Sequence, residues 1–177
     1  MVRYLKIICP LLALLGYLVL GCEKDDICAE TTATTPHLII RFYDVSNPTN
    51  TRSVRRLTVK GEGIDEEIVS NVDTDSIVLP LNFQDEGITA ISRFELKKDT
   101  DYDSDDNETT VSNTDIIEVN YTPEFIYVSR ACGYKSIFAG TEIDVDETND
   151  EDIWIINAVT ANTTIENETA AHINIYH

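Results

Sequence analysis

Three aspartates at alternate positions are the residues of this chain whose types and spacing most directly suggest metal chemistry. Asp101, Asp103 and Asp105 have the spacing of the first three ligands of an EF-hand loop, where alternate carboxylates converge on one calcium ion. The sixth position holds Asp106 instead of the glycine that the turn needs, and the twelfth holds Ser112 instead of a bidentate glutamate. A solvated acidic loop explains the same residues, so calcium is a secondary prediction and no cofactor is required.

A second acidic stretch strengthens the calcium prediction. Residues 140–152 contain seven carboxylates, and residues 99–113 contain the three aspartates. If Thr122-Pro123-Glu124 is the turn of a hairpin, both stretches leave the sheet at the same end. There they repel each other, and a divalent cation would relieve the repulsion. A cell-surface accessory that binds calcium or a glycan through these two loops is therefore one alternative function.

Signatures of enzymes are scarce in the sequence. It contains no Gly-x-Ser-x-Gly, no glycine-rich phosphate loop and no His-Glu-x-x-His. His37, His172 and His177 lie near the two ends of the expected domain and are typical of residues at strand borders. Trp154 stands between two isoleucines, which favours a place in the core over a platform for sugar binding. No catalytic residue is therefore assigned, although a hydrolase with a pair of carboxylates stays open among the 32 acids.

The four cysteines divide between processing and structure. Cys9 lies in an N-terminal leader and Cys22 directly after it, which leaves Cys28 and Cys132. Because export places a chain in an oxidising compartment, an even remainder of two predicts one disulfide, Cys28–Cys132. Closing a loop of about 100 residues stabilises a fold by about 4–5 kcal/mol in the chain-entropy model. A nucleophilic Cys132 has no supporting pattern, and Cys22 as a disulfide cysteine is the alternative to lipidation.

Residues 1–21 have the features of a secretion signal. Two basic residues precede an apolar stretch from Ile7 to Leu20, which is 14 residues long and falls short of the roughly 20 that span a membrane. The stretch ends in Val19-Leu20-Gly21-Cys22, which resembles a bacterial lipobox, although Leu20 is larger than the usual residue there. We expect Cys22 to carry the lipid, since two or more acyl chains anchor a protein stably. An uncleaved signal anchor is the alternative.

A lysine and two acids follow the expected lipidation site. Lys24, Asp25 and Asp26 resemble the surface-export signal of Bacteroidetes-type lipoproteins. With this signal, the sequence predicts a lipid-anchored protein of the outer membrane that is exposed at the cell surface. A solvated acidic tether explains the same residues and leaves the periplasmic face open.

The charge balance excludes one class of partner. The chain has 177 residues with 32 acidic and 13 basic side chains, a formal charge of −19. Without the leader, 156 residues remain and the charge is 11 − 32 = −21. A surface this negative repels nucleic acid and anionic headgroups. Hydrophobic residues make up 42%, which argues against an intrinsically disordered chain.

The elements that must hold these residues are short strands. No segment shows a sustained apolar period of 3.6 residues, and about eight stretches combine β-branched residues with flanking turn signals. We expect an all-β fold, an antiparallel β-sandwich, as a single domain over 37–177 behind a Thr-rich tether over 22–36. The expected strands are 38–45, 54–60, 76–82, 88–98, 115–122, 125–128 with its continuation 134–138 after a break or bulge at Gly133, 153–159 and 173–176.

Local features accompany these strands. Residues 46–50 have turn chemistry, and Thr122-Pro123-Glu124 is expected to be a tight connection. The odd spacing between Ile91 and Phe94 indicates a bulge. The clearest alternation places Ile117, Val119 and Tyr121 on one face of their strand.

The segment Tyr121–Phe138, with the sequence YTPEFIYVSRACGYKSIF, resembles the signature of an uncharacterised family of Bacteroidetes lipoproteins. Residues 164–173 are similar to the C-terminus of that family, and the lipobox, Cys28 and the Thr-rich tether resemble its start. The family is a domain of unknown function, so the resemblance implies the placement at the outer membrane and no activity. We therefore expect a non-enzymatic binding or envelope-assembly module, whose partners are the membrane and an envelope protein or a glycan.

Overall fold

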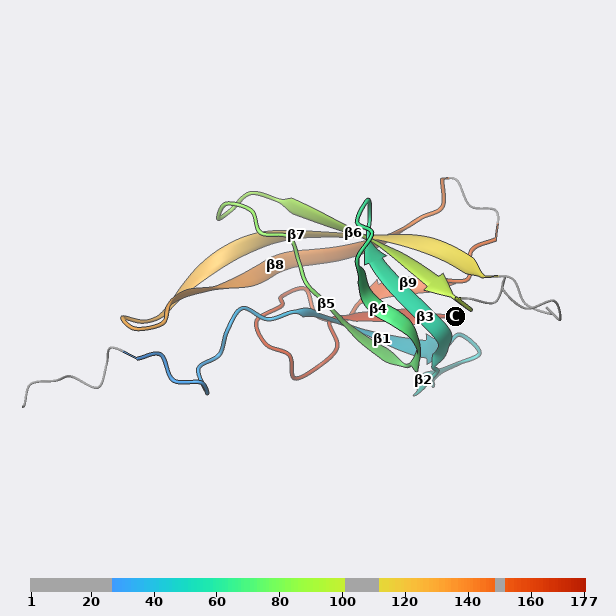
Figure 1. Cartoon of the computed structure of the whole chain (residues 1–177), viewed down its shortest axis with the longest axis horizontal. Helices are drawn as coiled ribbons and strands as arrows, with labels where there is room; N and C mark the ends of the chain where they lie inside the picture. Colours follow the sequence, from blue (N-terminus) through green and yellow to red (C-terminus); the bar gives the residue numbers. More distant parts are fainter. Residues whose placement is uncertain (1–26, 101–111, 149–151) are drawn as a thin grey trace, which may run out of the picture. The chain divides into compact units, whose positions relative to one another are not determined.

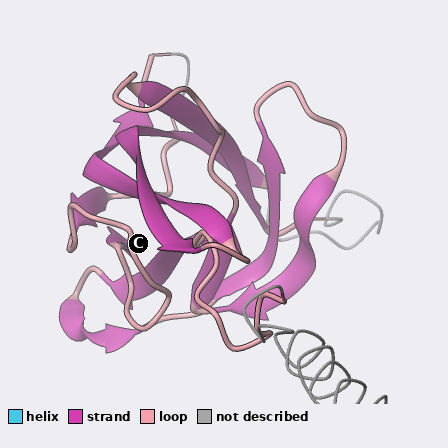
Figure 2. Ribbon diagram, turned by 90° about the vertical axis from the view of Figure 1, so that its left-hand side faces the viewer, coloured by secondary structure: helices cyan, strands magenta, loops and turns pink. Residues whose placement is uncertain are grey.

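The computed structural model describes residues 27–100, 112–148 and 152–177. This part of the chain contains ten strands (Figures 1 and 2). This part divides into two compact units, and the described residues of the first are 27–32 and 127–134. The second unit is Ala33–Ile126 with Lys135–His177, and it contains the core between two five-stranded sheets. No helix within the described ranges is long and apolar enough to span a membrane.

The first sheet is built on β1 (Leu38–Asp44), a run of β-branched and aromatic residues that suits a strand. β10 (Ile173–Tyr176) pairs with β1 in parallel, and β9 (Asn157–Thr160) pairs with β10 in antiparallel orientation. β2 (Asn47–Thr51) and β5 (Ser76–Leu79) pair antiparallel with β1. The expected antiparallel arrangement therefore has one parallel exception, which places the last strand beside the first.

The second sheet has the order β4 (Glu67–Thr74), β3 (Val54–Gly61), β6 (Ala90–Lys98), β7 (Asn113–Ser129) and β8 (Gly133–Asp146). A continuous register joins β6 to β7, from Ala90 opposite Tyr121 to Lys98 opposite Asn113. β6 pairs antiparallel with β3 on its other side, so it lies at the centre of the sheet.

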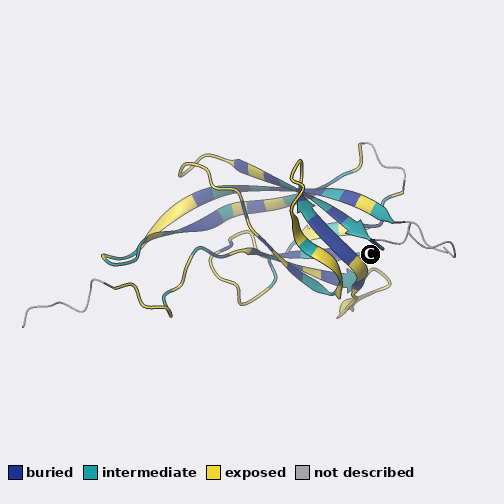
Figure 3. Cartoon of the chain, viewed as in Figure 1, coloured by how far each residue is buried: buried dark blue, intermediate teal, exposed yellow. Residues whose placement is uncertain are grey.

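Alternating side chains from both sheets form the core (Figure 3). Ile117, Val119 and Tyr121 are buried, as the alternation along their strand predicts. The predicted all-β sandwich is confirmed, with ten strands in place of about eight. The other large core residues are Leu38, Ile40, Phe42, Val54, Leu57, Val59, Ile77, Leu79, Leu81, Phe94, Leu96, Phe138, Trp154, Ile155, Ile165, Ile173 and Ile175.

The expected turn at Thr122-Pro123-Glu124 is wrong, because β7 continues through these residues to Ser129. The N–H and C=O groups of one strand residue point to the same side, and the carbonyl of Pro123 accepts a hydrogen bond of 3.0 Å from the N–H of Gly87. Gly87 precedes β6, so the missing N–H of Pro123 faces a side where the neighbouring strand has not yet begun. The sheet therefore loses no ladder hydrogen bond to the proline.

The expected bulge between Ile91 and Phe94 is also wrong, since β6 keeps its register with β7 throughout. Ser92 takes the inward position between Ala90 and Phe94, and the side chain of Ile91 is 51% exposed. The buried hydroxyl of Ser92 lies 2.7 Å from the hydroxyl of Tyr121, which donates to the carbonyl of Asn82, and Ser92 accepts from the N–H of Asn82. This closed ring of hydrogen bonds makes a serine acceptable in the core. Burial raises the pKa of Tyr121.

Four further segments differ from the prediction. Residues 47–51 form β2 instead of a turn, and β4 had no counterpart among the expected strands. The stretch 140–152 is not a loop throughout, since β8 extends to Asp146 with Thr141 buried and Val145 packed on the core. β9 begins only at Asn157, after a segment that has the expected apolar character but no strand pairing.

Candidate functional site

The predicted lipidation, export and calcium residues lie outside the described part of the chain. They are Cys22, Lys24, Asp25, Asp26, Asp101, Asp103 and Asp105. The ends of the two acidic stretches do meet, because the side-chain amide of Asn113 donates to the carbonyl of Asp152. Among the described residues, no three His, Cys, Asp or Glu side chains are grouped so as to hold a metal ion. Calcium binding by the three aspartates therefore stays a prediction.

The predicted disulfide Cys28–Cys132 is confirmed within the first unit. The two Cα atoms lie 4.9 Å apart and the cysteines are 104 residues apart in sequence. Ser129 Oγ accepts a 3.0 Å hydrogen bond from the N–H of Cys132, which holds the turn that follows β7. Neither thiol is free, so Cys132 is not available as a nucleophile.

Trp154 lies in the core, as its flanking isoleucines predict, and not on a sugar-binding surface. Its side chain is 4% exposed, and its Nε1–H donates to the carbonyl of Leu96 at 3.2 Å. The indole N–H has its hydrogen-bond acceptor and the rest of the ring is buried, so no face of the ring is open for a ligand to stack on.

Asp115, which was not among the predicted site residues, holds Trp154 in place. Its carboxylate is 2% exposed, and Oδ2 accepts hydrogen bonds from two consecutive backbone N–H groups, Trp154 at 2.9 Å and Ile155 at 2.7 Å. Asp115 lies on the same face of β7 as Ile117, Val119 and Tyr121. This alternation was the signal in the sequence that an acid would point inward. The residue is structural: it fixes the segment before β9 against β7.

His172 is a buried residue at a strand border and is neutral by its hydrogen bonds. Nδ1 lies 3.0 Å from the N–H of Ile39 and accepts from it, so the proton is assigned to Nε2, which donates to the carbonyl of Asn167 at 2.9 Å. Burial lowers the pKa of His172, and the carboxylate of Glu168 opposes this more weakly. The hydrogen bond from Ile39 connects the residue before β10 to β1, which is a structural role.

We expect the free energy of unfolding to decrease as the pH falls below about 6.5, the ordinary pKa of histidine. In this window the unfolded chain binds a proton at His172 and the folded chain does not, because burial lowers the folded pKa; acid therefore favours unfolding. His177, whose pKa burial also lowers, acts in the same direction. Urea unfolding between pH 7 and pH 5 measures the slope. His172→Asn keeps a hydrogen-bond acceptor near the position of Nδ1 but cannot titrate, so the dependence of the unfolding free energy on pH should become weaker. An unchanged pH dependence would contradict a neutral, buried His172.

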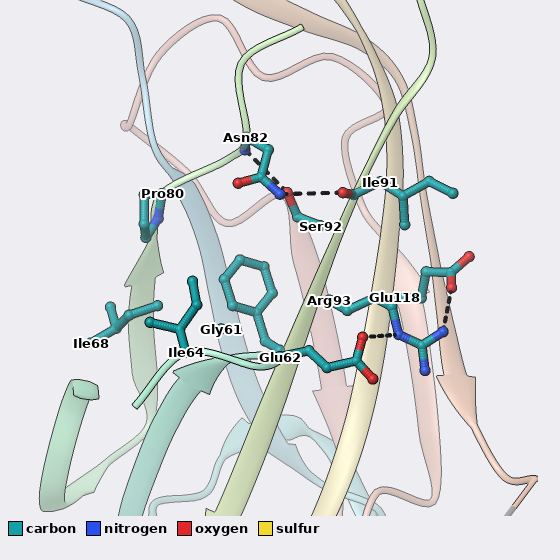
Figure 4. A pocket seen from close by; sticks show the side chains of 11 residues that line it. Gly61, Glu62, Ile64, Ile68, Pro80, Asn82, Ile91, Ser92, Arg93 and Glu118 are labelled. Atoms are coloured by element: carbon teal, nitrogen blue, oxygen red, sulfur yellow. Dashed lines mark hydrogen bonds and ion pairs between the residues drawn. The ribbon is translucent and has the colours of Figure 1, made fainter. Parts of the chain in front are cut away.

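One cavity in the second unit is a candidate binding site. It has a volume of about 500 Å³ and lies between the turn after β3, the segment after β5 and the first half of β6 (Figure 4). Ile64 and Ile91 on its wall are 58% and 51% exposed, so the wall presents accessible apolar surface. The lining residues are Gly61, Glu62, Ile64, Ile68, Pro80, Asn82, Ile91, Ser92, Arg93, Phe94 and Glu118.

Arg93 forms the polar side of this cavity and pairs with three carboxylates. Nε lies 2.8 Å from Glu62 Oε2, Nη1 lies 3.0 Å from Glu118 Oε2 and Nη2 lies 2.6 Å from Asp146 Oδ2. Hydrogen bonds from the hydroxyl and N–H of Thr148, and then from Arg93, lower the pKa of Asp146 to about 2. The hydrogen bond to Asp146 is in turn the main reason that the pKa of Arg93 is raised.

The cavity combines an apolar wall with an ion cluster. Glu62 and Glu118 both pair with one guanidinium, so the acids at the cavity belong to a structural ion cluster. An acid–base pair for hydrolysis needs two carboxyl groups in different protonation states facing a substrate. The apolar wall suits an apolar group, while the side-chain N–H of Asn82 donates to the carbonyl of Ile91 at 3.3 Å. The members of the ion cluster come from the turn after β3 and from β6, β7 and β8, so they could not be found from local sequence patterns.

Comparison with known proteins gives one match. Searches against curated proteins and against solved structures found no match. A family of unknown function, DUF6452, matches residues 56–177. The matched range includes both segments that resemble the uncharacterised lipoprotein family, 121–138 and 164–173, and excludes the leader and Cys28. Since the match covers more than half of the chain, this protein belongs to the family of unknown function DUF6452.

Proposed function

We propose that this chain is a lipid-anchored lipoprotein of the outer membrane in a Bacteroidetes-type envelope, and that it acts as a non-enzymatic module for binding or envelope assembly. The observation that carries the proposal is the Cys28–Cys132 disulfide. Disulfides persist in oxidising compartments and are rare in the cytosol, so the bond supports export. Cys22 stands six residues before Cys28 at the end of the lipobox-like sequence, which supports lipidation at that residue.

The binding role is supported by the cavity beside Arg93. Its exposed isoleucines provide apolar surface that a ligand or an envelope protein would cover, and its acids are engaged with Arg93. For the face of the membrane, Lys24-Asp25-Asp26 favours the cell surface by its resemblance to an export signal.

Cys22→Ala tests the anchor. We expect the wild-type protein to incorporate labelled fatty acid and to sediment with membranes, and the variant to lose the label completely because the thiol that carries the lipid is gone. Cys9→Ala is the matched control, since it removes a cysteine from the leader and should leave labelling unchanged. Equal labelling of Cys22→Ala and wild type would refute lipidation at this residue.

Protease treatment of intact cells tests the face of the membrane. Digestion of the wild-type protein, lost in Lys24→Ala, is the expected result for a surface lipoprotein. Protection until the cells are lysed would contradict surface exposure and would leave a role in the periplasm.

A further inference from the structure

The end of the β7–β8 hairpin, residues 127–134, combines exposed aromatic rings with a positive charge. We call this segment the hairpin tip; it belongs to the first compact unit together with residues 27–32. Tyr127 and Tyr134 are 57% and 69% exposed, and their rings meet edge to face with centroids 5.4 Å apart. Arg130 is exposed between them, and the tip contains no acid. In a chain with a formal charge of −19, a segment with aromatic rings and a single positive charge is distinctive.

The disulfide determines how far this tip can lie from the expected lipid. Cys132 is in the tip and is bonded to Cys28, which follows Cys22 by six residues. Six extended residues span at most about 22 Å, at roughly 3.3–3.6 Å per residue. The Cα atoms of the bonded cysteines add 4.9 Å. A lipid on Cys22 therefore keeps Cys132 within about 27 Å of the lipid-bearing residue, whatever path the connecting residues take.

We propose that the hairpin tip docks on the headgroup layer of the bilayer in which the acyl chains of Cys22 insert, an inference that rests on the proposed lipid anchor. Tyrosine side chains have an apolar ring and a polar hydroxyl, and they are enriched where membrane meets water. The guanidinium of Arg130 can pair with lipid phosphate groups. The chain as a whole is acidic and is repelled by such a surface, whereas the tip contains no acid and one positive charge, so charge does not oppose contact through the tip.

The test uses the full-length lipoprotein reconstituted in phosphatidylethanolamine–phosphatidylglycerol vesicles that contain brominated lipid, which quenches tryptophan. Trp154, the single tryptophan, is buried and supplies a low background. Tyr134→Trp adds a fluorophore at an exposed aromatic position of the tip, and Ile156→Trp is the matched control at an exposed position of the second unit that does not line the cavity. We expect the added emission of Tyr134→Trp to be lost to brominated lipid and that of Ile156→Trp to persist.

Two outcomes would overturn the proposal. Equal quenching of the two variants would mean that the tip is not the contact, and no quenching of Tyr134→Trp would leave the tip as a surface for a protein partner. The mass of the purified protein separates these results from failure of the anchor itself. If Cys22 carries no lipid, the proposed function fails; if it carries lipid and Tyr134→Trp stays unquenched, only the docking of the tip fails.

Discussion

Asp115→Ala is expected to lower the free energy of unfolding by about 2–5 kcal/mol, because it leaves two buried backbone N–H groups without their acceptor. The carboxylate accepts from the N–H groups of Trp154 and Ile155 in a place where water does not reach. Each buried donor that loses its partner costs about 1–3 kcal/mol, more than the hydrogen bond contributes in net terms. Urea unfolding followed by far-ultraviolet circular dichroism measures the loss independently of the environment of Trp154.

Two further variants control this experiment. Asp115→Asn keeps one acceptor oxygen without the charge, and its loss should fall between those of the wild type and the alanine variant. Asp144→Ala removes a carboxylate from an exposed position of β8, where the effect should stay within about 0.5 kcal/mol. If Asp115→Ala is no more destabilising than Asp144→Ala, the assigned role of Asp115 is wrong.

Replacing both disulfide cysteines, as Cys28→Ser with Cys132→Ser, is expected to lower the free energy of unfolding by about 2–4 kcal/mol. The bond closes a loop of 104 residues in the unfolded chain, for which the chain-entropy model sets an upper value of about 5 kcal/mol. Both cysteines belong to the first unit, so the core between the sheets keeps its contacts. The loss should therefore come mainly from a less restricted unfolded state.

The denaturant dependence distinguishes this mechanism from damage to the fold. A less restricted unfolded chain exposes more surface, so the slope of the unfolding free energy against urea should increase in the double variant. Wild-type protein in reductant is the matched control and should unfold at the same urea concentration as the double variant. A double variant that unfolds like the oxidised wild type would contradict a stabilising disulfide.

The sequence predicted those strands whose side chains alternate between core and solvent. Residues 115–121 and 173–176 show this alternation, and both lie in strands with buried inward residues. β2 and β4 were missed because every residue of β2 and most residues of β4 are exposed. Such edge strands are held by hydrogen bonds to a neighbour, and their own side chains carry little periodic signal.

Turn chemistry was misleading where the neighbouring strand decided the outcome. Pro123 indicates a turn by itself, yet β7 passes through it because the strand beside it begins only at Ala90. Ser92 indicates a break in an apolar pattern, yet Tyr121 and Asn82 satisfy its hydroxyl and the register continues. In both cases the deciding partner is remote in sequence.

By itself, the sequence determined the all-β class, the pairing of Cys28 with Cys132 and the burial of Trp154. Each follows from composition, from elimination among a few residues or from a pattern that repeats within a few positions. Only the tertiary structure decided the course of β7, the role of Asp115 and the carboxylate cluster around Arg93. The physical reason is separation along the chain: Asp115 binds residues 39 and 40 positions away, and Arg93 pairs with Glu118 and Asp146, 25 and 53 positions away. Contacts of that range exist only once the sheets have formed.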